Sequence, residues 1–195
     1  MLLFLDIMKL TNLRYLAKGK RSQVYSAYYK KEKVAVKYSH RAEIEAYWLK
    51  KLSKLKFVPK LLYSDKEKII YEFIEGETID KYIEHSKNPI PILKQVLKQC
   101  YELDKLKINK KELTHPYKHI LIKNKKAKMI DFERCYETDN PKNVTQFGQY
   151  IMSGRMSSVF KKCKFILDKK TFTKLLKEYK KHKTKFSFLK LLASF

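Results

Sequence analysis

The sequence has few of the residues that interrupt regular structure, with only four glycines and five prolines among 195 residues. Flexible low-complexity linkers need many more such residues, so the composition excludes a string of domains joined by them. No internal repeat of the length used by solenoid proteins is present. A chain of this length is expected to form one compact unit or two small lobes that share a cleft.

Cysteine is also scarce. The three cysteines, Cys100, Cys135 and Cys163, are far apart and odd in number, which argues against a disulfide framework and against a four-ligand zinc site. We therefore expect a cytoplasmic protein.

Long apolar runs are missing, so the sequence predicts no transmembrane segment. The first five residues, Met1 to Leu5, look like the start of a signal peptide, but Asp6 interrupts them and no small-residue cleavage site follows. Met8 is an alternative start, because Met8-Lys9-Leu10 opens the first pattern that is typical of folded structure.

Acidic residues are outnumbered, with 20 Asp and Glu against 45 Lys and Arg, and the formal net charge is +25. Such a charge attracts nucleic acid, acidic proteins or anionic lipid. Lysine-rich usage is also found in proteins of thermophiles. A polyanionic partner such as RNA and a generic solvated surface are therefore both open alternatives.

The first part of the chain has the pattern of a small antiparallel sheet. Residues 13–16 and 24–29 are β-prone runs around a polar, basic turn, and residues 34–38 predict a third strand. Helical spacing follows over residues 41–55, with one apolar stripe made of Ile44, Trp48, Leu52 and Leu55. Two further β-prone runs lie between residues 61 and 74, so we expect five strands and one helix.

Glu75-Gly76-Glu77-Thr78 breaks the strand pattern and marks the expected boundary between a small lobe, residues 1–74, and a large lobe, residues 75–195. Pro91 begins a longer helix with one apolar face, and two short strands follow between residues 120 and 130. The remainder is mainly helical. The predicted fold class is α+β.

Two short motifs place charges where a nucleoside triphosphate needs them. Val34-Ala35-Val36-Lys37 ends a β-branched run with a lysine that can hold phosphates, and Ile130-Asp131-Phe132-Glu133 puts an aspartate after an apolar strand, where it can hold a metal ion. Taken alone, Lys37 is also typical of a solvated strand end, and Asp131 of a turn cap.

An inward lysine needs an acid to hold it in place. Glu45 on the following helix can supply that acid, and Glu43 is the competing partner. We prefer Glu45 because the neighbouring Ala46 allows close packing.

The turn of the first hairpin has the spacing Ala17-x-Gly19-x-x-Ser22-x-Val24. This places alanine and serine at the outer positions of a glycine-rich phosphate loop, and backbone amides around Gly19 can cover phosphates. A plain hairpin turn explains the same residues.

Over about residues 13 to 135 the chain resembles the protein-kinase-like superfamily. The features that carry the resemblance are, in chain order, this turn, the Lys37 motif, Glu45, the segment Tyr71-Glu72-Phe73-Ile74-Glu75-Gly76 and the Asp131 motif. No Ala-Pro-Glu motif follows Asp131, so the chain looks more like the compact kinases of the RIO and Kae-associated type. The segment from Glu112 to His119, with Asp131 and residues 141–145, is similar to a small family of predicted archaeal Ser/Thr protein kinases.

The resemblance implies a two-lobed kinase fold. In such a fold the backbone of the hinge between the lobes, here residues 70–76, binds the adenine edge, so that Glu72 and Ile74 act through their main-chain groups. The residues predicted to bind ATP are Ala17, Gly19, Ser22, Val24, Ala35, Lys37, Glu45, Tyr71, Glu72 and Ile74.

The resemblance also places a catalytic loop between Asn109 and Ile122. Counted back from His119, the catalytic aspartate position falls on Thr114, which cannot act as a base at neutral pH, whereas a loop longer by two residues places Glu112 there. We prefer Glu112. The implied metal ligands are Asp131 and His119, although magnesium prefers oxygen, so the histidine would instead touch phosphate or favour manganese.

These residues predict an ATP-dependent phosphotransferase, a minimal Ser/Thr protein kinase that uses Mg²⁺ or Mn²⁺ and a protein substrate. The alternative is a non-catalytic kinase-like module that binds nucleotide, RNA or another polyanion, because Lys110-Lys111 stands where the archaeal family has a His-Gly pair.

Overall fold

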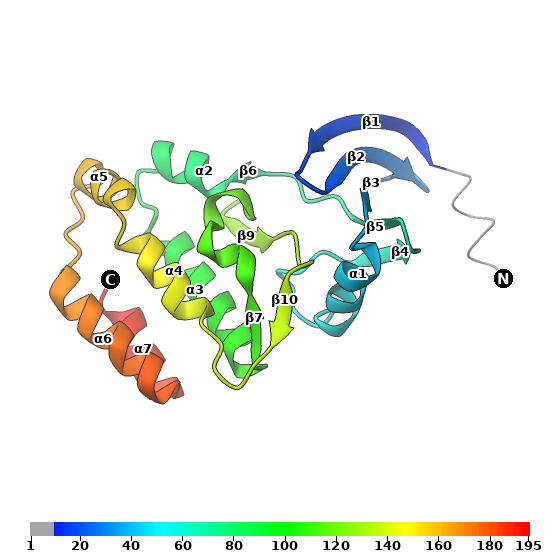
Figure 1. Ribbon diagram of the computed structural model, residues 1–195. Coiled ribbons are helices and arrows are strands. Elements are labelled where there is room, and N and C mark those ends of the chain that lie inside the picture. Colours follow the sequence, from blue (N-terminus) through cyan, green and yellow to red (C-terminus); the bar gives the residue numbers. More distant parts are fainter. Residues whose placement is uncertain (1–9) are drawn as a thin grey trace. The chain divides into compact units, whose positions relative to one another are not determined.

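The computed structural model describes residues 10–195 and divides the chain into two compact units (Figure 1). The first unit contains the described residues up to Glu75 together with Lys128–Glu133, and the second contains Gly76–Ala127 and Arg134–Phe195. The alternative starts Met1 and Met8, and the segment compared with a signal peptide, lie outside the described residues.

The first unit is built on a five-stranded antiparallel sheet in the order β1-β2-β3-β5-β4, which confirms the predicted sheet. Its elements are β1 (Thr11–Lys18), β2 (Ser22–Tyr29), β3 (Glu32–Ser39), α1 (Ala42–Lys51), β4 (Leu61–Ser64) and β5 (Lys68–Glu72). The β1–β2 hairpin forms because β-branched and aromatic residues flank a turn in which the Gly19 amide donates to the Ser22 carbonyl at 2.8 Å.

Strand register gives the two faces of this sheet different contents. Val24 pairs with Lys37, and Ala35 pairs with Tyr71, so these four residues share one face. The opposite face carries a buried apolar cluster of Ala27, Val34, Val36 and Ile70.

Helix α1 packs against β3, β4 and β5. Trp48 and Leu52 of the predicted stripe are buried, but Ile44 at the start of the stripe is not. Ile44 is 47% exposed, whereas Glu45 and Ala46 are buried. The ion pair between Glu45 and Lys37 explains the difference, because it turns the Glu45 side of the helix towards the sheet. The helix also ends at Lys51, earlier than the periodicity predicts.

The second unit is mainly helical. Its helices are α2 (Ile79–His85), α3 (Ile90–Lys105), α4 (Asn143–Ile151), α5 (Gly154–Lys162), α6 (Lys169–His182) and α7 (Lys185–Ala193), with short 3-10 turns η2 (Lys111–Thr114) and η3 (Pro116–Lys118). Its strands are β6 (Glu77–Thr78), β7 (Ile108–Lys110), β8 (Ile120–Lys123) and β10 (Cys135–Glu137), and β9 (Lys126–Met129) begins here and ends in the first unit.

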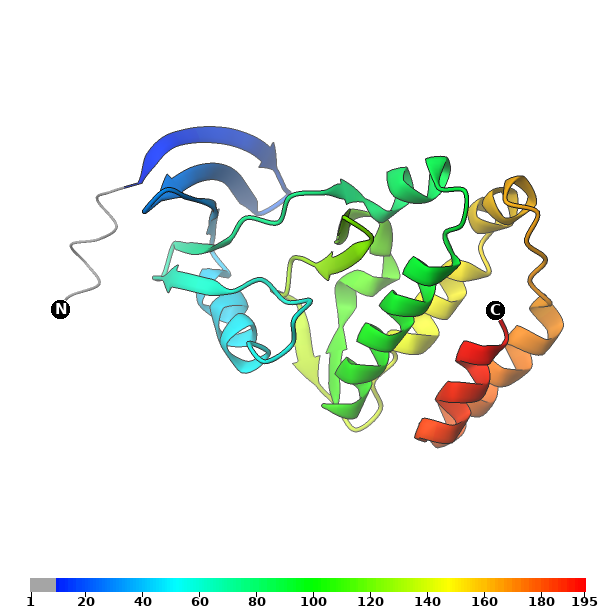
Figure 2. The same cartoon turned by 180° about the vertical axis from the view of Figure 1, so that it is seen from behind.

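Helix α3 is the centre of this unit, and Figure 2 shows it beside α4. Its apolar face buries Leu93, Val96, Leu97 and Leu103, as the spacing predicts. Leu106, expected on the same face, follows the helix and is 49% exposed. Within residues 10–195, no helix has the length and apolar character needed to cross a membrane.

A buried polar network links α3 to the strand that precedes Glu112. Asp104 accepts hydrogen bonds from the Asn143 side chain at 2.7 Å and from the Tyr179 hydroxyl at 2.8 Å. Asn143 in turn accepts from the backbone amide of Lys110 at 2.8 Å. Burial raises the pKa of Asp104, and the hydrogen bonds offset part of that rise. The network holds β7 in place, and β7 pairs with β10 in a strand pair that the sequence pattern did not predict.

Gly76 begins the second unit with φ of +146°, a conformation that residues with a side chain rarely adopt. A Cβ atom at this position would lie 2.6 Å from the Ile122 carbonyl oxygen on β8. Both observations explain why a glycine stands at this position, where the second unit begins.

Candidate nucleotide and metal site

The segment Lys128–Glu133 is fixed to the first unit at three points. Lys128 forms an ion pair with Glu72, and the Met129 amide donates to the Phe57 carbonyl at 2.9 Å. The Phe132 amide donates to the Glu45 carboxylate at 3.0 Å, and the Phe132 ring is fully buried. These contacts place the short Asp131 motif beside α1, although it is distant from the rest of the unit in sequence.

Lys37 is the centre of a cluster of three carboxylates. Its Nζ atom lies 2.7 Å from Glu45, 3.1 Å from Asp131 and 3.4 Å from Glu133. The structure therefore pairs Lys37 with Glu45 rather than with the competing Glu43. Exposure increases across the cluster, from 5% and 2% for the Lys37 and Glu45 side chains to 13% for Glu133 and 29% for Asp131. Solvent reaches the cluster from the Asp131 side.

The environment keeps Lys37 charged. Burial alone would lower its pKa, but the charges of Glu45 and Asp131 outweigh burial and raise the pKa. Burial raises the pKa of Glu45, against the effect of Lys37, and the nearby Asp131 adds to this rise. Three carboxylates thus face one ammonium group, and when all are ionised the cluster has an excess of negative charge.

The same three carboxylates form a possible site for a divalent cation. One oxygen of each of Glu45, Asp131 and Glu133 lies within 4.8 Å of the others. Carboxylate oxygens are the ligands that Mg²⁺ and Mn²⁺ prefer, and a divalent ion would balance the excess negative charge. The donor set therefore fits the predicted metal, with Glu45 and Glu133 as candidate ligands in addition to Asp131.

Asp131 has φ of +64°, in the left-handed region that Asp and Asn adopt more readily than most residues. The chain turns at this point, so that the side chains of Asp131 and Glu133 both reach Lys37. This backbone conformation decides which substitutions can test the site.

Several predicted ATP-binding residues lie on the Lys37 face of the sheet. Val24 is the cross-strand neighbour of both Lys37 and Ala17, and Ala35 is the neighbour of Tyr71. Ala35 and Tyr71 are buried, and burial raises the pKa of the tyrosine hydroxyl. The sheet thus brings together Ala17, Val24, Ala35, Lys37 and Tyr71.

The remaining predicted ATP-binding residues are placed differently. Glu72 pairs with Val34 on the opposite face, and its amide donates to the Lys60 carbonyl at 2.9 Å. Ile74 follows β5 and is half-buried. Gly19 and Ser22 form the hairpin turn itself, so the Gly19 amide is engaged within the turn.

Glu112 belongs to the second unit, and its side chain is only 1% exposed. It lies between two cations, with Arg134 Nε at 2.6 Å from one carboxylate oxygen and Lys110 Nζ at 3.3 Å from the other. Lys110 is fully buried. Lys110, one of the two lysines that replace the His-Gly pair of the archaeal pattern, is thus a buried partner of Glu112.

Thr114 and His119 also lie in the second unit. Thr114 ends η2 and donates its hydroxyl to the Lys111 carbonyl at 3.0 Å. His119 follows η3, is half-buried, and donates its amide to the Pro116 carbonyl at 3.0 Å. Neither residue belongs to the carboxylate cluster of the first unit.

The sequence interpretation missed three residues of these sites. The Asp131 motif predicts no separate role for Glu133, and the position of Glu133 two residues after Asp131 is the signal that could have found it. Arg134 and Lys110 were assigned no role towards Glu112, because surface lysines and arginines are the usual expectation in so basic a chain.

Replacing Lys37 by methionine should destabilise the first unit strongly. The change would leave Glu45 buried without its cation, and breaking a buried ion pair costs about 3–5 kcal/mol. Chemical denaturation of the variant should show this loss in the free energy of unfolding. Lys33→Met is the matched control, because Lys33 lies on the same strand, is 37% exposed and lies 3.8 Å from Glu75. A similar loss in both variants would contradict the structural role given to the cluster.

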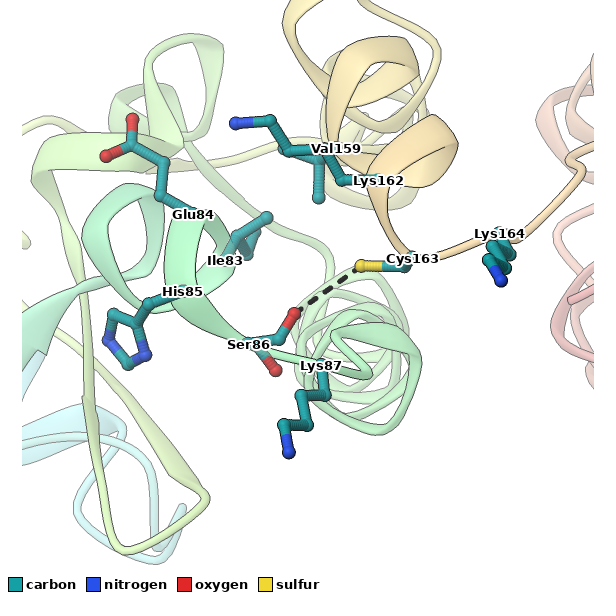
Figure 3. Close-up of a pocket in the computed structure, with 9 residues that line it drawn as sticks. All are labelled: Ile83, Glu84, His85, Ser86, Lys87, Val159, Lys162, Cys163 and Lys164. Atoms are coloured by element: carbon teal, nitrogen blue, oxygen red, sulfur yellow. Dashed lines mark hydrogen bonds between the residues drawn. The ribbon is translucent and has the colours of Figure 1, made fainter.

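The second unit contains a small pocket of about 280 Å³ between the ends of α2 and α5 (Figure 3). The Cys163 thiol donates to the Ser86 carbonyl at 3.4 Å across it. Lys87, Lys162 and Lys164 also line this pocket, together with Glu84 and His85.

No family model matches this chain. An uncharacterized protein of Methanocaldococcus jannaschii is 34% identical over 76 residues, which covers 38% of this chain and 65% of that protein. The crystal structure of a kinase domain superposes with a TM-score of 0.53 and 18% identity, and the match covers 65% of this chain and 51% of that domain. The chain thus spans less than two thirds of the length of either protein. The structural similarity shows that this chain has a kinase-like fold.

Proposed function

We propose that this protein is an ATP-dependent phosphotransferase, a minimal Ser/Thr protein kinase that acts on a protein substrate. The observation that carries the proposal is the buried contact of Lys37 with Glu45 at 2.7 Å beside Asp131, on a kinase-like fold. The fold alone does not identify a reaction, so the proposal rests on these side chains.

The residues of the first unit have separate roles in this proposal. Lys37 would hold the α- and β-phosphates, and Glu45 would fix the lysine side chain. Asp131 and Glu133, the more exposed acids of the cluster, would hold the metal together with Glu45. The bound metal would neutralise negative charge on the phosphates. The apolar side chains of Val24 and Ala35 would line the adenine site.

Glu112 is the proposed residue that orients the acceptor hydroxyl and takes its proton. Its carboxylate lies between Lys110 and Arg134, and the Asp104–Asn143 network supports the strand before it. His119 would contact phosphate or take part in binding manganese.

The burial of Glu112 favours a second candidate function, a non-catalytic module that binds nucleotide. A base must reach the proton that it removes, and a carboxylate that is 1% exposed and already paired with two cations is poorly placed for this task.

Incubation with γ-labelled ATP and Mg²⁺ or Mn²⁺ tests the proposed activity. We expect label to enter Ser or Thr hydroxyl groups of the protein itself or of an added protein acceptor, and addition of a chelator should abolish it. If ATP binds but no label is transferred under any of these conditions, the activity is ruled out and the non-catalytic module remains.

A further inference from the structure

The sheet of the first unit carries a row of tyrosines on the face opposite to that of Lys37. Tyr15 on β1, Tyr25 on β2 and Tyr38 on β3 form what we name the tyrosine ladder. The ring centroids of Tyr15 and Tyr25 are 5.6 Å apart, and those of Tyr25 and Tyr38 are 5.8 Å apart, with edge-to-face angles of 78° and 87°. In Figure 1 the three strands lie next to one another.

Strand register places this ladder opposite the nucleotide site. Tyr15 pairs with Tyr25, and Tyr25 pairs with Val36, whose side chain belongs to the apolar cluster on that face. Lys37 is the next residue along β3, so its side chain points to the other face. The tyrosine ladder is therefore a separate surface from the proposed ATP site.

The ladder is only partly covered. Tyr25 packs against the apolar cluster, but Tyr15 is 58% exposed and Tyr38 is 39% exposed. Isolated exposed aromatic side chains are common, but exposed rings arranged in a contiguous row mark an interaction surface.

Positive charge lies directly beside the ladder. Lys18 is the cross-strand neighbour of Gln23, which is itself the neighbour of Tyr38, so these three residues form a second row on the same face. Lys20 and Arg21 lie in the hairpin turn that follows Lys18. We call Lys18, Lys20 and Arg21 the basic tip. The basic tip and Tyr38 line a common pocket of about 580 Å³, together with Gly19 and Ser22 of the predicted phosphate loop and with Glu67 as its acidic lining residue.

We propose that the tyrosine ladder and the basic tip bind single-stranded nucleic acid. Bases would stack on the rings of Tyr15 and Tyr38, and phosphates would contact the basic tip. Successive bases on aromatic rings beside a positively charged groove are the usual arrangement in such proteins. A duplex hides the faces of its bases, so it would lose the contribution of the rings.

Among polyanions, the tyrosine rings favour a single nucleic-acid strand, because its bases are unpaired and can stack on them. An acidic peptide or an anionic lipid surface would be attracted by the basic tip and by the net charge of +25, but neither offers flat groups that stack on the ladder. The aromatic and basic side chains together therefore point to nucleic acid rather than to these alternatives.

Fluorescence anisotropy with labelled oligouridine and oligodeoxythymidine tests the proposal, with a duplex and polyglutamate for comparison. We expect single strands of either sugar to bind more tightly than both, with an affinity that falls as salt rises. The double substitution Tyr15→Ala with Tyr38→Ala should weaken binding at least about tenfold at fixed salt. Replacing Lys20 and Arg21 by glutamine should reduce the salt dependence, because each lost phosphate contact lowers the slope by about one.

Matched controls separate this surface from general charge and from the nucleotide site. Tyr28→Ala removes a ring that is 41% exposed at the far end of β2, and Lys174→Gln with Lys177→Gln removes two exposed charges on α6. Tyr28→Ala should weaken oligonucleotide binding much less than the double tyrosine variant. The Lys174 and Lys177 substitutions should change the salt dependence of binding less than the Lys20 and Arg21 substitutions. Asp131→Asn should leave oligonucleotide binding intact whether or not the protein binds ATP. Thermal unfolding should first show that the double tyrosine variant is folded. The proposal is overturned if this variant binds oligouridine as tightly as the unchanged protein does. It is also overturned if the duplex or polyglutamate binds the unchanged protein as tightly as the single strands do.

Discussion

Asp131→Asn should remove the stabilisation of the protein by ATP and magnesium. A ligand at a hundred times its Kd raises the free energy of unfolding by about 2.7 kcal/mol, and we expect the variant to lose most of this increase. The reason is that asparagine keeps one oxygen but loses the negative charge that balances the cation. Asparagine also tolerates the positive φ of Asp131, whereas alanine would add backbone strain to the loss of the carboxylate.

The control for this variant is Asp139→Asn. Asp139 is 92% exposed and lies 2.8 Å from Lys107 in the second unit, so the chemical change is identical but is made outside the cluster. Thermal unfolding of both variants should be measured with and without ATP and Mg²⁺. Equal retention of the ligand effect in Asp131→Asn and Asp139→Asn would show that Asp131 holds no part of the ligand.

Glu112→Gln should distinguish an enzyme from a binding module. If Glu112 takes the proton of the acceptor, the rate of phosphoryl transfer should fall by about 10²- to 10⁴-fold, while stabilisation by ATP and magnesium remains unchanged. The substitution also removes the anion between Lys110 and Arg134, so part of any loss could come from instability. Glu112→Asp controls for this effect, because it keeps the charge but moves the carboxylate back by one methylene.

The readouts for these two variants are the transfer rate at a temperature where both are folded and the thermal shift with ATP. A rate in Glu112→Gln within about twofold of the unchanged protein would exclude Glu112 as the base, since general bases contribute much more than this. In that case its role would be structural, as the buried anion of the ion pair network.

Local sequence patterns predicted most of the first unit. The five strands follow from β-branched and aromatic runs, and the hairpin follows from its polar turn, because each depends on residues close together in the chain. Trp48 and Leu52 on the predicted face of α1 are buried, but the exposure of Ile44 was not predicted, for a different reason. It depends on the contact of Glu45 with Lys37 on another element, and an apolar stripe cannot show that a glutamate will be buried.

The second unit was harder to predict because its polar residues are buried. The strand pair of β7 and β10 has a mixed pattern, and the Asn143 side chain that fixes β7 comes from a distant part of the chain. Lysine is usually a surface residue, yet Lys110 is fully buried beside Glu112. Packing and long-range hydrogen bonds decide such burial. The spacing of residues along the chain gives no information about either.

A titration of the unchanged protein tests whether the Lys37 cluster binds ATP together with a divalent metal. When all three are ionised, the carboxylates of the cluster should repel ATP that lacks a metal, because their negative charge then exceeds that of Lys37. We predict that ATP raises the midpoint of thermal unfolding in a saturable way with Mg²⁺ or Mn²⁺ present, and that the rise is lost when a chelator removes the metal. An equal rise without metal, or no rise with it, would contradict the proposed binding.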